Sequence, residues 1–143
     1  MLRKISIIDK SAIKYRNEKF IPLGIGGSDH PYILCVNRFP GISQDEITDR
    51  VVVNKSNTTR TLARLEEDGY IERVINQDDK RVYNVHLTEK GKNIIPKIQE
   101  INISLEEYLF EDFTFEEKEQ FENLLNKVYN KAVEYARKDW KKR

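Results

Sequence analysis

A run of short polar and basic side chains between residues 54 and 66 is the stretch of this chain best suited to binding chemistry. Its candidate contact residues are Lys55, Ser56, Asn57, Thr58, Arg60 and Arg64. No carboxylate precedes Glu66 in the run. Asparagine and serine can hydrogen-bond base edges, arginine binds guanine or phosphate, and a helix N-terminus attracts phosphate. The run therefore predicts a helix end suited to a DNA major groove, with an ordinary solvated helix face as the alternative.

A charged turn follows this helix and adds a second group of candidate residues. Two runs rich in β-branched and aromatic residues, 70–76 and 81–87, flank a polar turn and predict a β-hairpin. Lys80 and Arg81 at its tip could reach a minor groove, where the negative potential favours arginine. We expect Asp79 to hold Arg81 in position, with a plain turn residue as the alternative.

Two predicted helices position these residues. Ser43 and Glu46 form a capping box at the start of the first helix, which ends at the valines 51–53. Asn54 is a good N-cap for the second helix, which we expect to run to Asp68 and to stop at Gly69. In that second helix, the spacing predicts that Leu62, Ala63 and Leu65 face the core.

Amphipathic helices surround this central part. The spacing of apolar residues predicts a helix over 1–20, and Ser28 begins another that ends near Phe39. Thr88 caps a long helix, and Thr114 caps the last helix. Pro96 inside the long helix is expected to kink it or to free a carbonyl group. The apolar seams of the outer helices favour either a dimer interface or an intramolecular bundle.

Composition limits the remaining choices. The chain has 143 residues, of which 34% are charged, and a formal net charge of only +1. A nucleic-acid-binding role therefore depends on where the basic residues are placed, because the net charge gives it no support. The single cysteine, Cys35, excludes an internal disulfide. Without an apolar membrane span or a visible signal peptide, we expect a cytoplasmic protein with no membrane partner.

The ordered set of motifs resembles the winged helix of the multiple antibiotic resistance regulator (MarR) family. The residues that carry it are Ser43-Gln44-Asp45-Glu46-Ile47, Val53-Asn54-Lys55-Ser56, Thr59-Arg60, the run from Leu65 to Ile71, Asp79-Lys80-Arg81 and Leu87-Thr88-Glu89-Lys90-Gly91. The sequence departs from the family pattern at Asn54 and at Asn57-Thr58, where the family often has Ser and Thr-Val. This departure leaves the operator sequence open.

The resemblance implies a mainly α (α+β) fold in one domain, 1–143. A winged helix-turn-helix lobe at 28–92 would be flanked by dimerisation helices at 1–20 and 93–143. It implies a homodimeric transcription regulator, a ligand-responsive repressor on a pseudo-palindromic operator of double-stranded DNA. A winged-helix protein-interaction module without a DNA function is the alternative, since fold does not settle function.

No catalytic centre or metal site is expected, and no cofactor. The two histidines, His30 and His86, have no neighbouring nucleophile or ligand cluster, so we do not expect an enzyme. Cys35 lies in an apolar run, where a cysteine is usually an inert hydrophobe rather than a redox sensor. The resemblance implies a small aromatic effector near the junction of the lobes. The candidate residues there are Tyr15, Phe20, His30 and Tyr32, with core packing as the alternative for each.

Overall fold

The computed structural model describes residues 1–138 and divides the chain into two compact units. The first unit is Met1–Leu105, and the second begins at Glu106. Residues 139–143, the end of the predicted C-terminal dimerisation segment, lie outside the described residues. Among the described residues, no helix is both long and apolar enough to cross a bilayer.

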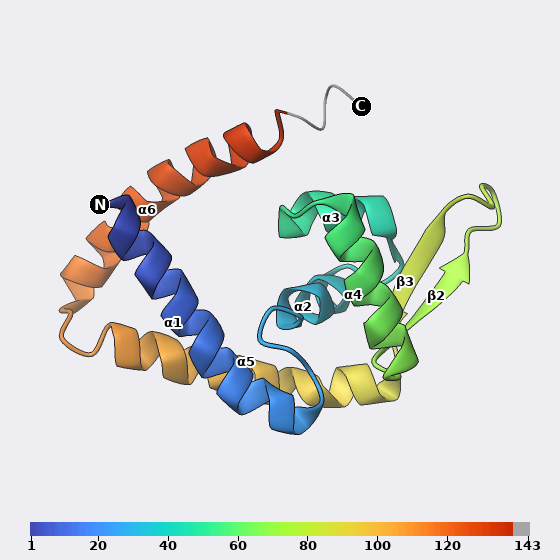
Figure 1. The fold of residues 1–143 in the computed structure, drawn as a ribbon, viewed down its shortest axis with the longest axis horizontal. Coiled ribbons are helices and arrows are strands. Elements are labelled where there is room, and N and C mark those ends of the chain that lie inside the picture. Colours follow the sequence, from blue (N-terminus) through green and yellow to red (C-terminus); the bar gives the residue numbers. More distant parts are fainter. Residues whose placement is uncertain (139–143) are drawn as a thin grey trace. The chain divides into compact units, whose positions relative to one another are not determined.

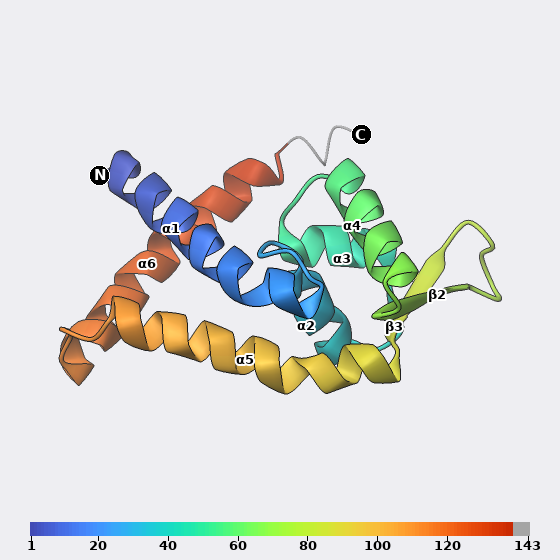
Figure 2. The same ribbon diagram turned by 60° about the horizontal axis from the view of Figure 1, so that its bottom comes forward.

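The first unit combines helices with a small antiparallel sheet (Figures 1 and 2). Its helices are α1 (Leu2–Phe20), the short 3-10 helix η1 (Ile21–Leu23), α2 (His30–Arg38), α3 (Gln44–Val51), α4 (Lys55–Glu67) and most of α5 (Glu89–Leu109). Its strands are β1 (Ile42–Ser43), β2 (Ile71–Ile75) and β3 (Tyr83–Leu87), in the order β1-β3-β2. Both views show the β2–β3 hairpin projecting beyond α4, as a wing does.

Local capping signals begin and end the central helices where the sequence predicts. Ser43 and Glu46 form both hydrogen bonds of a capping box at the start of α3. The side chain of Asn54 accepts a hydrogen bond from the Asn57 backbone N–H and caps α4. Gly69 follows α4 with a φ of 80°, a conformation that glycine adopts without strain. The helix-turn-helix is therefore set by short-range hydrogen bonds as well as by packing.

The core lies between α2, α3, α4, the sheet and α5. Its fully buried members include Ile33, Ile47, Leu62, Val85 and Ile98. Burial of such side chains is the main favourable term in folding, at roughly 1.5–3 kcal/mol each.

The prediction that Ala63 faces the core is wrong. Ala63 is exposed, and Thr58 and Thr61 face inward with Leu62 and Leu65 instead. These four inward positions follow the i, i+3, i+4, i+7 spacing of a single helix face.

One other prediction is wrong, and one strand was not predicted. Ser28 does not cap α2, which begins at His30 with Asp29 as its N-cap residue and Pro31 in its first turn. The very short strand β1 was not predicted, and it pairs Ile42 with Val85 of β3. Pro96 lies inside α5, and the helix continues through it.

The second unit holds the last turn of α5 and helix α6 (Phe115–Ala136). Thr114 and Glu117 form the predicted capping box of α6. Three aromatic rings, those of Phe110, Phe113 and Phe121, pack edge to face near the turn between the two helices. None of the residues of α6 is buried in the described chain, and Leu125, Val128 and Tyr129 of its apolar seam are exposed.

Candidate nucleic-acid interface

The exposed face of α4 carries most of the predicted contact residues. Lys55, Ser56, Arg60 and Arg64 are exposed, and Asn57 is half-buried. The prediction that Thr58 contacts DNA is wrong. Its side chain is fully buried, and its hydroxyl faces the Asn54 carbonyl oxygen inside the first turn. It cannot contact a base without opening the core. Thr58 lies four residues before the core residue Leu62, a spacing that places both on one face of the helix. This spacing predicts a core position for Thr58.

Asn57 links the start of α4 to Arg60. The Asn57 backbone N–H donates to the Asn54 side chain at 2.8 Å, and its own side-chain oxygen accepts from Arg60 Nη2 at 2.5 Å. The cap and the Arg60 guanidinium are therefore connected through one asparagine. This holds the Arg60 donors close to the N-terminal turn, where the helix dipole attracts anions.

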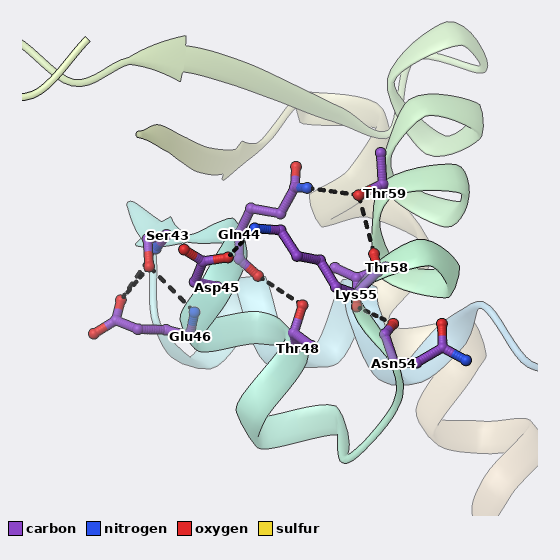
Figure 3. Close-up of polar contacts among 9 residues, drawn as sticks. All are labelled: Ser43, Gln44, Asp45, Glu46, Thr48, Asn54, Lys55, Thr58 and Thr59. Atoms are coloured by element: carbon purple, nitrogen blue, oxygen red, sulfur yellow. Dashed lines mark hydrogen bonds and ion pairs between the residues drawn. The ribbon is translucent and has the colours of Figure 1, made fainter. Parts of the chain in front are cut away.

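Two residues at the interface were missed by sequence reasoning. Thr59, rather than Thr58, lies on the exposed face of α4. Gln44 Nε2, at the start of α3, donates to Thr59 Oγ1 at 3.0 Å (Figure 3). This bond ties α3 to α4 across the turn. The outward position of Thr59 was readable from helical periodicity, whereas its pairing with Gln44, fifteen positions away, had no sequence signal.

The tip of the wing is organised by side-chain hydrogen bonds to the backbone. The Asn76 side chain accepts from the backbone N–H groups of Asp78 and Asp79 at 2.8 and 3.0 Å. The Asp79 carboxylate accepts from the Arg81 backbone N–H and from its guanidinium. These bonds lower the pKa of Asp79, because the Arg81 guanidinium stabilises its ionised form. Arg81 is nevertheless 90% exposed, so its remaining donors face solvent.

The start of α4 and the wing meet at a small cavity. It has a volume of about 170 Å³ and is lined by Ser43, Gln44, Asp45, Lys55, Arg81, Val82 and Tyr83. Lys55 and Arg81, from separate elements, thus contribute their charges to one recess. Asp45 lies 3.5 Å from the Lys55 ammonium and offsets part of that charge (Figure 3).

Arg64, another candidate contact residue, makes an ion pair within the protein. Its Nη2 donates to Asp29 Oδ1 at 2.5 Å, and the Asp29 side chain is only 6% exposed. One donor of the Arg64 guanidinium thus binds a buried carboxylate, while the Arg64 side chain as a whole is 52% exposed.

The residues predicted to bind an effector are mainly core residues. Phe20 is fully buried, Tyr32 is buried in the same cluster, and the ring of His30 lies 5.3 Å from that of Phe20. Burial, with the nearby Arg16 charge, lowers the pKa of His30 to about 4, so its imidazole is neutral at pH 7. Only Tyr15 keeps part of its surface exposed, so these four residues form no open binding site.

Comparison with known proteins identifies the family. The model of the MarR family matches residues 29–83. The uncharacterized HTH-type transcriptional regulator YwoH of Bacillus subtilis is 32% identical over 127 residues, covering 87% of this chain and 90% of YwoH. A solved structure of MarR is 34% identical, covers 91% of this chain and 95% of its own, and has a TM-score of 0.80. A mutant MarR from E. coli, complexed with operator DNA, is 28% identical, covers 88% and 91%, and has a TM-score of 0.81.

These matches extend over the helices on both sides of the winged lobe. They confirm the predicted mainly α fold with a winged helix-turn-helix. The family consists of transcriptional regulators rather than enzymes, which confirms the prediction that the chain is not an enzyme. The chain belongs to the MarR family of transcriptional regulators.

Proposed function

We propose that this protein is a homodimeric repressor that binds double-stranded DNA sequence-specifically and responds to a small aromatic effector. The observation that carries DNA binding is the recess shared by Lys55 at the start of α4 and Arg81 on the wing. A groove-bound helix and a minor-groove wing would bring their cations to adjacent segments of one backbone. The similar E. coli MarR mutant, which is complexed with operator DNA, supports DNA binding.

We infer roles for the other side chains from their positions on α4 and on the wing. Lys55, Ser56, Asn57 and Arg60 would contact the major groove, and Thr59 joins them in place of the buried Thr58. Arg81 would enter the minor groove, with Lys80 beside it and Asp79 orienting it. Asparagine and arginine side chains can read base edges with paired hydrogen bonds.

Apolar surface on the outer helices supports the homodimer. In the first unit, Ile7 and Ile8 of α1 are each 52% exposed. In the second unit, Leu125, Val128 and Tyr129 of α6 are about as exposed as these isoleucines. Seams of this kind on amphipathic helices are normally buried against another helix. Segments 1–20 and 93–143 would therefore form the dimerisation helices around the lobe at 28–92, with recognition helices roughly 34–36 Å apart.

An open cavity beside α1 supports the effector. It has a volume of about 510 Å³ and is lined by Lys10, Ile13, Lys14, Asn17, Glu18, Ile21 and Pro22. Apolar walls with nearby lysines suit an aromatic carboxylate. A ligand that prefers one arrangement of the lobes over another would shift DNA affinity. A thermal-shift screen of phenolic and aromatic acids checks this part, and no shift with any of them would count against it.

The first experiment is selection of duplexes from a random DNA pool with the purified full-length protein. Recovery of an inverted repeat, with affinity that falls steeply as salt rises, supports the proposal. The Lys55→Gln/Arg81→Gln variant should lose this selection, whereas Lys92→Gln/Lys97→Gln, which removes the same charge from α5, should retain it. Recovery of no sequence above background would instead favour a winged helix that binds proteins, as the net charge of +1 would permit.

Oligomeric state is tested separately by sedimentation equilibrium. The wild-type chain should sediment as a dimer at micromolar concentration. Leu125→Gln/Val128→Gln places two polar amides on the α6 seam and should shift the protein toward monomer while the lobe stays folded. A wild-type monomer at all concentrations would contradict the homodimer.

A further inference from the structure

A chain of polar contacts connects the recognition helix α4 to the N-terminal helix α1. It begins at Arg64, whose Nη2 contacts Asp29 Oδ1 at 2.5 Å. The second carboxylate oxygen of Asp29 accepts from the Gly26 backbone N–H at 3.0 Å. The next glycine, Gly27, donates its backbone N–H to Asn17 Oδ1 of α1 at 2.7 Å. All of these groups lie within the first compact unit.

The contacts leave little freedom for the loop between α1 and α2. A Cβ atom at Gly27 would lie 2.6 Å from Asn17 Oδ1 and 2.9 Å from the Asn17 backbone nitrogen. These distances are shorter than real Cβ contacts, so the close approach requires glycine. The loop is therefore pressed against α1, and Asp29 is held at a fixed distance from that helix.

The carboxylate of Asp29 is unusual for a residue at the start of a helix. Asp29 is the N-cap residue of α2, yet its side chain makes no capping hydrogen bond. The whole residue is 4% exposed, and its two carboxylate oxygens contact Gly26 and Arg64 instead. A buried carboxylate without a cationic partner is strongly unfavourable, so Arg64 has to remain beside it.

The position of Arg64 gives this pair control over the exposed face of α4. Arg64 lies one turn beyond Arg60, on the same side of the helix. The helix packs on the core through Thr58, Leu62 and Leu65. The Arg64–Asp29 contact adds a second attachment on its flank. This attachment would therefore restrain how Arg60 and its neighbours are presented.

We propose that Arg64 is a positioning residue that Asp29 holds in place, and that the pair sets the orientation of the recognition helix relative to α1. Arg64 does not itself contact DNA. This inference rests on the proposed DNA-binding function and adds to it a residue pair that determines specificity without touching a base.

Substitution of Asp29 separates positioning from phosphate binding, because only the positioning role predicts a loss of operator affinity. Asp29→Asn leaves the Arg64 charge in place and releases it. If Arg64 positions α4, affinity for the selected operator should fall about tenfold, whereas affinity for random duplex should change little. If Arg64 instead binds phosphate, release of its guanidinium should leave operator affinity unchanged or increase it. Glu67→Gln, which removes an exposed carboxylate from the same helix, is the charge-matched control and should not weaken operator binding.

The double variant Asp29→Asn/Arg64→Gln keeps the test valid if a single variant fails to fold. It removes both charges together, so that neither charge is left without its partner. The slope of log affinity against log salt reports how many phosphates the protein binds, and it falls by about one for each phosphate that is no longer bound. We expect an unchanged slope with a reduced ratio of operator to random-duplex affinity.

The possible results distinguish failure of the positioning role from failure of the proposed DNA-binding function. A slope reduced by about one in the double variant, or an Asp29→Asn variant that binds the operator as the wild type does, would overturn the positioning role alone. If the wild-type protein selects no duplex at all, the proposed function fails and this inference fails with it. Thermal unfolding of each variant, followed by circular dichroism, ensures that folded proteins are compared.

Discussion

The carboxylate of Asp79 accepts two hydrogen bonds from the Arg81 guanidinium, at 3.1 Å from Nε and 3.2 Å from Nη2. A third bond, from the Arg81 backbone N–H at 3.0 Å, fixes the backbone between the two residues. Because the pair is largely exposed, its contribution to folding stability is small. Its consequence is geometric, since the contacts limit the directions in which the arginine can point from the wing.

The wing pair should affect DNA binding far more than stability. Arg81→Ala removes the minor-groove cation and should lower operator affinity roughly tenfold. Asp79→Asn keeps that cation but loosens its orientation, so we expect a smaller loss, roughly two- to fivefold. Fluorescence anisotropy with the selected operator measures both. Equal affinity of Arg81→Ala and wild type would show that the wing does not contact DNA.

Arg60 should determine which sequence is bound. Its contact with Asn57 places its guanidinium near the start of α4, where base edges would lie. Arg60→Ala should therefore weaken operator binding by roughly 1–3 kcal/mol and relax the preference at one base pair in each half-site. A repeat of the duplex selection with the variant reveals this as a position of the consensus that no longer shows a preference. A uniform loss over all sequences would reassign Arg60 to phosphate.

The fold was predictable from the sequence where its signals are local. The caps at Ser43, Asn54 and Thr114 act within three residues of themselves, so a short window of sequence contains both partners. The wing was found for the same reason, since its turn lies between two strands with a strong β pattern. The domain limits remain a prediction. The dimer also remains a prediction, because its interface would involve a second copy of the chain.

The site was less predictable because its geometry depends on contacts between distant residues. Arg64 and Asp29 are 35 positions apart, and nothing near either residue indicates the other. Gln44 gives no local signal either, because its partner Thr59 belongs to the next helix. Thr58 was misassigned for a different reason, namely that a polar residue type was given more weight than its position on the inward face.

The turn between α3 and α4 contains a strained residue. Val52 has a φ of 56°, in the left-handed region, and is the one residue other than glycine with a positive φ in the described chain. A β-branched residue is unfavourable there, by roughly 1–2 kcal/mol. Val52→Gly should therefore raise the free energy of unfolding by roughly 0.5–1 kcal/mol, after the entropic cost of glycine. Urea denaturation measures this difference.

Val53 provides the matched comparison for that turn. It packs against the hydrophobic core and has no positive φ, so Val53→Gly removes apolar contacts without relieving strain. It should lower the free energy of unfolding. If Val52→Gly destabilises the protein as much as Val53→Gly does, the backbone strain at Val52 contributes nothing measurable.

His30 should make stability depend on pH in a defined window. Its pKa is about 4 in the folded protein, because burial and then the Arg16 charge disfavour the imidazolium, whereas an unfolded histidine has a pKa of about 6.5. Between these values the unfolded chain binds a proton that the folded chain does not. Stability contributed by the neutral imidazole is therefore complete above pH 6.5 and is lost as the pH falls toward 4. The loss from pH 7 to pH 5 should be on the order of 1–2 kcal/mol.

Urea denaturation at pH 7, 6 and 5 measures this dependence. The range avoids Glu66 and Asp79, whose lowered pKa values affect stability mainly below their ordinary values of 4.5 and 3.8. His30→Gln keeps a donor for the Gly27 carbonyl oxygen, which lies 3.1 Å from His30 Nδ1, but cannot titrate. The variant should be less stable at pH 7 because its packing against Phe20 changes, yet its stability should be nearly constant across the range. If wild type and variant lose stability in parallel as the pH falls, the dependence arises from other groups, and the buried imidazole is not its source.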